Sequence, residues 1–147
     1  MKARALSLAA AIIFFLFSVS DIDGQTIPSI WTPETQVKLK VPGTPKISPD
    51  GRRVVYTVNE AVMTADKSEF ITQIWIANTD GTNNRQITFG ERSSANPKWS
   101  PDGKFIAFTS NRKDNRNQIY VLNAEGGEAE QITDGKSGVG NFEWLIL

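Results

Sequence analysis

The segment Gly135-Lys136-Ser137-Gly138 carries residue types that two kinds of functional loop require. A serine between glycines suits the strained turn that presents an attacking hydroxyl, and Gly-Lys-Ser suits a loop that cradles phosphate. The nucleophile pattern Gly-x-Ser-x-Gly fails because residue 139 is Val, and the phosphate-loop pattern fails because residue 130 is Glu where glycine is required. We therefore assign neither a nucleophile nor a phosphate site to this segment.

The chain contains no His and no Cys. A Ser-His-Asp triad cannot be assembled from this chain alone, and cysteine nucleophiles, thiolate metal sites and disulfides are excluded. Asp21-Ile22-Asp23-Gly24 is too short for a calcium loop, and Gly126-Gly127 suits a hairpin rather than a dinucleotide fingerprint. The sequence thus predicts no catalytic residue, no metal site and no cofactor.

The composition favours a folded, turn-rich protein without a nucleic-acid partner. Among 147 residues, 16 are basic and 16 are acidic, so the formal net charge is zero, whereas nucleic-acid binding needs a clustered basic excess. Hydrophobic residues make up 39% of the chain, which argues against disorder, and 11 Gly with 7 Pro suit a β protein with many turns. The length suggests one domain at most.

Residues 1–20 have the pattern of a secretory signal peptide. Lys2 and Arg4 form a basic head, Ala5–Val19 is an uncharged apolar run, and Ser18 and Ser20 offer small residues for a signal peptidase. The alternative is a membrane anchor, but this run falls short of the roughly 20 apolar residues that span a bilayer. We expect cleavage near Ser20, export to the periplasm or medium, and no membrane association afterwards.

The rest of the chain repeats itself. Lys46–Val58 matches Lys98–Ser110, 52 residues later, at six of thirteen positions. Gln73–Gly90 matches Gln118–Gly135, 45 residues later, at eight of eighteen positions. A further copy begins at Asn141, because Asn141-Phe142-Glu143-Trp144 follows Asn96-Pro97-Lys98-Trp99 by 45 residues. A period of about 45 residues built from short strands is typical of β-propeller blades.

Four strands can be assigned to the second repeat: Pro97–Ser100, Lys104–Ser110, Gln118–Asn123 and Ala129–Thr133. A Ser-Pro-Asp-Gly turn separates the first two strands of each repeat, with proline and glycine setting its backbone. The structural turn residues are Ser48, Pro49, Asp50 and Gly51 in the first repeat, and Ser100, Pro101, Asp102 and Gly103 in the second. We predict an all-β fold of four-stranded antiparallel propeller blades.

The expected organisation is an incomplete propeller of two blades and the start of a third. After the signal peptide, residues 21–42 form an N-terminal extension with a short helix, 43–92 the first blade, 93–137 the second, and 138–147 the truncated third. Gly43–Leu147 has 105 residues, whereas a four-bladed ring needs about 180. This organisation is expected of a truncated gene product, a frameshifted tail or a fragment.

The strands carry apolar residues on both faces, so each sheet is expected to lie between two neighbours. One of the pairs Phe105/Ala107 and Ile106/Phe108 should then meet water, because too little chain follows the second repeat to cover both faces. Repeated aromatic residues are expected to pack between blades. Asn59–Thr72, with fourteen residues where Asn111–Asn117 has seven, is expected to be a longer surface loop. The alternative is that it reaches a partner or a pore.

These repeats resemble the propellers of two groups of proteins. One is the prolyl oligopeptidase family of serine peptidases, which includes dipeptidyl and acylaminoacyl peptidases, and the other is the periplasmic TolB type. Trp31–Val58 is similar to the entry of bacterial prolyl-oligopeptidase-family enzymes, where a short T-P-E-x-x-x-x-L-K helix precedes the first Ser-Pro-Asp-Gly repeat. Thr32 suits the cap of that helix, Pro33 its first residue and Glu34 its first turn.

The resemblance implies the N-terminal propeller fragment of an exported serine peptidase, in which the blades filter peptides on their way to a separate catalytic domain. No family catalytic residue matches a position of this sequence, so the chain itself is not expected to be an enzyme. Peptide would be its substrate partner only within the full-length enzyme. The alternatives are a TolB-like propeller that binds a protein partner without enzymatic activity, and a non-functional remnant.

Overall fold

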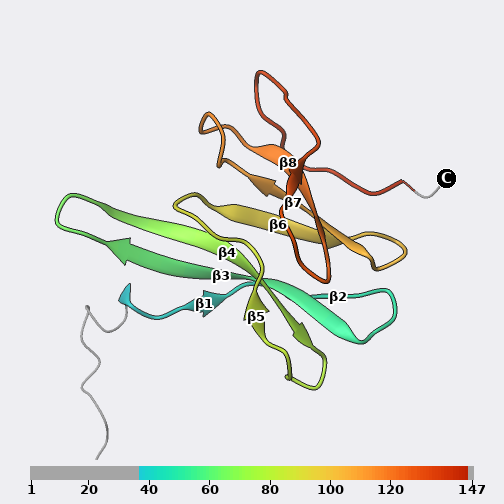
Figure 1. Cartoon of the computed structure of the whole chain (residues 1–147). Helices are drawn as coiled ribbons and strands as arrows, with labels where there is room; N and C mark the ends of the chain where they lie inside the picture. The colour runs from blue at the N-terminus through green and yellow to red at the C-terminus, as the bar shows by residue number, and fades with distance from the viewer. Residues whose placement is uncertain (1–36, 146–147) are drawn as a thin grey trace, which may run out of the picture. The chain divides into compact units, whose positions relative to one another are not determined.

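The computed structural model of the chain describes residues 37–145, which belong to one compact unit. The expected signal peptide and most of the short helix after Trp31 lie outside the described residues. The described part contains nine strands (Figure 1): β1 Val41–Pro42, β2 Lys46–Ile47, β3 Arg53–Met63, β4 Ser68–Asn78, β5 Arg85–Gln86, β6 Ser94–Trp99, β7 Phe105–Ser110, β8 Gln118–Asn123 and β9 Glu130–Gln131. This confirms the all-β prediction. Among residues 37–145, no helix has the length and apolarity needed to cross a bilayer.

The strands form two antiparallel sheets that share one plan. The second sheet has the order β6-β7-β8-β9. The first sheet has the order β1-β3-β4-β5, and β2 also pairs with β3. β1 and β2 thus occupy in two pieces the edge position that the continuous β6 occupies in the second sheet. The interruption lies at Gly43, where an added Cβ would meet Thr57 Oγ1 at 2.2 Å, so only glycine lets the chain bend this close to β3.

The core lies between the two sheets. The first sheet contributes Val55, Ile74, Ile76 and Ile87, and the second contributes Trp99, Ile106, Phe108, Tyr120, Leu122 and Ala124. The Phe108 and Tyr120 rings stack at 5.9 Å between centroids. Ile106 and Phe108 are therefore the pair that faces the first sheet. On the opposite face Phe105 is partly exposed, but Ala107 is buried, so only one member of the pair expected to meet water does so.

The segment Asn59–Thr72 was expected to be a surface loop, and this expectation is wrong. β3 and β4 stay paired in register from Arg53↔Asn78 to Met63↔Ser68, so the extra residues lengthen a hairpin whose turn comprises only residues 64–67. Figure 1 shows this hairpin as the longest ribbon of the molecule. Val62, Phe70 and Ile71 are residue types that favour strands, and the loop expectation overlooked them.

Candidate functional site

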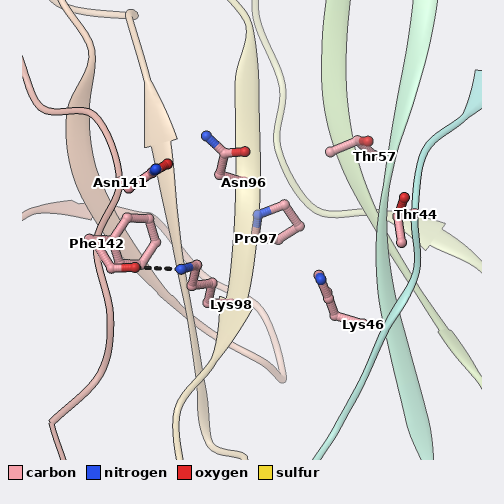
Figure 2. A pocket seen from close by; sticks show the side chains of 8 residues that line it. All are labelled: Thr44, Lys46, Thr57, Asn96, Pro97, Lys98, Asn141 and Phe142. Atoms are coloured by element: carbon pink, nitrogen blue, oxygen red, sulfur yellow. Dashed lines mark hydrogen bonds between the residues drawn. The ribbon is translucent and has the colours of Figure 1, made fainter.

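A cavity of ≈ 350 Å³ opens where the leading edges of the two sheets meet the start of the third repeat (Figure 2). It is lined by Thr44, Lys46, Thr57, Asn96, Pro97, Lys98, Asn141 and Phe142. We call it the leading-edge groove. An adjoining hollow shares Lys46, Pro97 and Lys98 and adds Glu143. Residues from 44 to 143 along the chain thus converge on one region.

A β-bulge shapes the wall of the groove formed by β6. The β6–β7 register shifts between Ala95 and Lys98, and Asn96 has a φ of 53°, a left-handed conformation that few residues other than glycine adopt. The Asn96 side chain donates to Thr109 Oγ1 at 3.4 Å. Bulges are common at sheet edges and re-aim the side chains of the strand, so this one sets the direction of the β6 residues that line the groove.

A contact that occurs twice fixes the walls of the groove. Trp99 Nε1 donates to the Lys46 carbonyl at 2.9 Å, and Trp144 Nε1 donates to the Lys98 carbonyl at 3.2 Å. Each tryptophan lies near the start of its own repeat and donates a hydrogen bond to the first strand of the repeat before it. The Arg53 guanidinium lies 5.1 Å from the Trp99 ring centroid, which adds a cation–π contact.

The two lysines of the groove differ in their partners. Lys98 Nζ donates to the Phe142 carbonyl and to Glu143 Oε1, and it lies 5.1 Å from the Phe142 ring centroid. Figure 2 draws the first of these bonds as a dashed line. Within residues 37–145, Lys46 Nζ forms neither a hydrogen bond nor a salt bridge. Among the described residues, the ammonium group of Lys98 therefore has partners and that of Lys46 has none.

The Ser-Pro-Asp-Gly residues form two turns of the same geometry. Ser48 Oγ donates to Asp50 Oδ1 at 2.6 Å and accepts from the Arg53 amide at 2.9 Å. Ser100 Oγ donates to Asp102 Oδ1 at 2.6 Å and accepts from the Phe105 amide at 2.9 Å. Gly51 and Gly103 have φ values of 72° and 70°.

Both turn aspartates are stabilised in their charged form. The serine hydroxyl, and then a backbone amide, lowers the pKa of Asp50 and of Asp102 below the ordinary aspartate value. Pro49 borders the adjoining hollow, but neither turn lines the leading-edge groove. The side-chain hydrogen bonds of these eight residues, from Ser48 to Gly51 and from Ser100 to Gly103, lie within the two turns and join each turn to the strand that follows it.

A pair of polar side chains that was not predicted from the sequence also occurs twice, buried in the first repeat and partly buried in the second. Thr88 Oγ1 donates to Gln73 Oε1 at 2.7 Å and accepts from the Ile74 amide at 2.8 Å. Thr133 Oγ1 and Gln118 Oε1 form the same bond at 2.8 Å. These bonds join β4 to the residues that follow β5, and β8 to the residues that follow β9. They explain why Gln and Thr recur in both repeats.

The groove is lined mainly by polar side chains. Its side chains supply ammonium, amide and hydroxyl groups, and no acid–base pair lies beside a nucleophile. Ser137 lies in an exposed turn closed by the Gly138 amide and the Gly135 carbonyl at 3.0 Å. In the described part of the chain, no group of three or more acidic side chains could hold a metal ion.

The groove was not predicted from the sequence, although the repeats align several of the residues that form it. Asn96-Pro97-Lys98-Trp99 and Asn141-Phe142-Glu143-Trp144 match as repeat starts, and a role in packing between blades is expected only of their aromatic residues. The signal that could have identified the site is the change of charge at one repeat position, where Lys46, Lys98 and Glu143 follow one another.

Comparison with known proteins places this architecture in a family. The family model described as TolB beta propeller domain matches residues 33–143. Dipeptidyl-peptidase 5 of Porphyromonas endodontalis is 32% identical over 115 residues, which cover 74% of this chain and 16% of the relative. The chain thus spans only a small part of the curated peptidases that it matches.

Solved structures of two peptidases are also similar to this chain. The acylaminoacyl peptidase of Pyrococcus horikoshii has a TM-score of 0.55 at 25% identity, and the match covers 72% of this chain and 16% of that one. A variant of the AtxE2 isopeptidase has a TM-score of 0.63 at 20% identity, covering 78% of this chain and 22% of that one, which bears on the fold alone. With two sheets of one repeated plan and a family match over most of its length, the chain belongs to the TolB beta propeller domain family.

Proposed function

We propose that the chain is the N-terminal propeller part of an exported serine peptidase of the prolyl oligopeptidase family. The observation that carries this proposal is the 32% identity to dipeptidyl-peptidase 5 over 115 residues, which make up only 16% of that enzyme. In such an enzyme the propeller would gate the access of peptides to a separate catalytic domain. This chain would contribute binding surface and no catalytic group.

The leading-edge groove is the surface best suited to that role. In propellers the sheets surround a central channel, and the leading edges of the two sheets converge where the groove lies. Its hydroxyl and amide side chains suit the polar backbone of a peptide. Under this proposal, Thr44, Asn96 and Asn141 face the path that a peptide would take.

A TolB-like propeller that binds a protein partner and has no enzyme attached is the second candidate. The family model that covers residues 33–143 favours it, because that model describes the propeller and not a peptidase. Both candidates predict a protein that binds without catalysis.

The purified chain is expected to hydrolyse no peptide or ester substrate, because it has no histidine base. Active-site-titratable turnover by the pure protein would contradict this. The DNA that follows the Leu147 codon then separates the two candidates. A hydrolase-domain reading frame there supports the peptidase, whereas further propeller repeats followed by a stop codon support the TolB-like protein.

Export is part of the proposal and rests on the pattern of residues 1–20. Ile13→Arg places a charge in the middle of the apolar run, which opposes membrane insertion by about 2.5–3.5 kcal/mol, so the variant should remain in the cytoplasm. Fractionation measures retention, and mass spectrometry of the exported wild type should give an N-terminus near Asp21. An exported Ile13→Arg protein, or a membrane-embedded product with an intact N-terminus, would contradict a cleaved signal.

A further inference from the structure

We propose that the leading-edge groove binds the carboxylate of a peptide and that Lys46 is its ionic partner. The inference rests on the proposed function, because it names the chemical feature of the peptide that the groove would select. It is carried by a comparison between two lysines that the repeat places in equivalent positions, Lys46 and Lys98.

At Lys98, residues of the next repeat bind the ammonium group of the lysine. The next repeat supplies Glu143 as its ionic partner and the Phe142 carbonyl as a second acceptor. Glu143 stands 45 residues after Lys98, at the same position of its own repeat. An acidic group from the next repeat thus satisfies this ammonium.

For Lys46, the equivalent residue of the next repeat is basic instead of acidic. The residue that corresponds to Glu143 one repeat earlier is Lys98, so the next repeat offers Lys46 a second cation instead of an anion. Both lysines border the groove and the adjoining hollow. Glu143 supplies one negative charge against two positive ones, which leaves the region with a net charge of +1. No residue between 37 and 145 therefore supplies Lys46 with a counter-charge, and the groove beside it is open to a ligand.

The neutral groups around Lys46 favour a peptide carboxylate. The Thr44 and Thr57 hydroxyls and the Asn96 and Asn141 amides line the same groove. These groups can donate to carboxylate oxygens and to peptide carbonyls. A volume of ≈ 350 Å³ lies at the small end of ligand pockets and suits a short peptide segment. A nucleic acid would need a broad basic surface, which a net charge of zero does not supply.

Three N-acetylated tripeptides test the proposal with the whole 147-residue chain. Acetyl-Ala-Ala-Ala with a free carboxylate carries a terminal charge, acetyl-Ala-Glu-Ala-amide carries a side-chain charge, and acetyl-Ala-Ala-Ala-amide carries none. Binding is followed by calorimetry and by tryptophan fluorescence, since Trp99 and Trp144 contact the carbonyls of Lys46 and Lys98. We expect at least one charged peptide to bind about tenfold tighter than the neutral one, and added salt to weaken that preference. The charged peptide that binds more tightly shows whether the groove takes a C-terminal or a side-chain carboxylate.

Substitutions assign the preference to Lys46. Lys46→Gln should abolish the preference for the charged peptide, whereas Lys46→Arg should keep it within a few fold because the charge remains. Lys104→Gln is the matched control, because Lys104 is an exposed lysine in the second turn and lies outside the groove. Thermal unfolding of each variant verifies its fold.

Equal binding of the charged and neutral peptides, or a preference that survives in a folded Lys46→Gln variant, overturns the proposal. A Lys46→Arg variant that folds and loses the preference also contradicts it. These results leave the peptidase role untouched, because that role depends on the reading frame after Leu147. Conversely, a TolB-type reading frame together with carboxylate binding would refute the peptidase role and retain the site.

Discussion

Phe108→Ala is expected to lower the free energy of unfolding by about 3–5 kcal/mol, the range for removing a buried aromatic ring from a core. Phe108 has no exposed surface, and its ring stacks on Tyr120. The Arg112 guanidinium covers the same pair, 5.4 Å from the Phe108 centroid and 4.8 Å from the Tyr120 centroid. Because domains of this size are stable by only about 5–15 kcal/mol, the loss should be visible as a large fall in the unfolding midpoint.

Phe70→Ala is the matched control for this prediction. Phe70 lies on the extended β3–β4 hairpin and is 64% exposed, so its removal should change the free energy of unfolding by about 0.5 kcal/mol or less. Urea unfolding followed by tryptophan fluorescence measures both variants. Similar changes for Phe108→Ala and Phe70→Ala would show that the interface between the sheets does not stabilise the protein.

The second large effect is self-association of the chain from Asp21 to Leu147. Equivalent residues show that, within residues 37–145, the outer face of each sheet is more exposed than the interface between the sheets. Ile87 is 8% exposed at the inner interface, and its repeat equivalent Ile132 is 55% exposed. Trp99 is 9% exposed, and its equivalent Ile47 is 64% exposed. Each apolar side chain left in water forgoes about 1.5–3 kcal/mol of burial, and repeat proteins normally need polar caps at their ends.

We therefore expect the mass in sedimentation and the unfolding midpoint to depend on protein concentration, and the chain to bind a hydrophobic dye. Ile47→Ser combined with Ile132→Ser should reduce both association and dye binding. Phe89→Ser should change them less, because Phe89 is equally exposed but has Asp134 as its repeat equivalent and belongs to neither repeated face. A monomer with a cooperative, concentration-independent transition would show that two sheets suffice.

The sequence by itself determined the local structure, because that structure depends on contacts between residues close in the chain. Each Ser-Pro-Asp-Gly turn is closed by bonds that span two to five residues, such as Ser100 Oγ to Asp102 and the Phe105 amide to Ser100 Oγ. The period of about 45 residues and the short apolar strands then predicted antiparallel propeller blades. The resemblance of the Ser-Pro-Asp-Gly repeats and of Trp31–Val58 to known propellers implied the family. The absence of His and Cys excluded imidazole and thiol chemistry by composition alone.

Only the tertiary structure decided which face of β7 is buried and what lies in the leading-edge groove. Both faces of β7 are apolar, so alternation could not indicate that Ile106 and Phe108 face the first sheet. The charge balance of the groove depends on Lys46, Lys98 and Glu143, which lie 52 and 45 residues apart. Their proximity follows from the stacking of the repeats. As a result, the next repeat supplies an acidic partner to Lys98, whereas no described residue supplies one to Lys46.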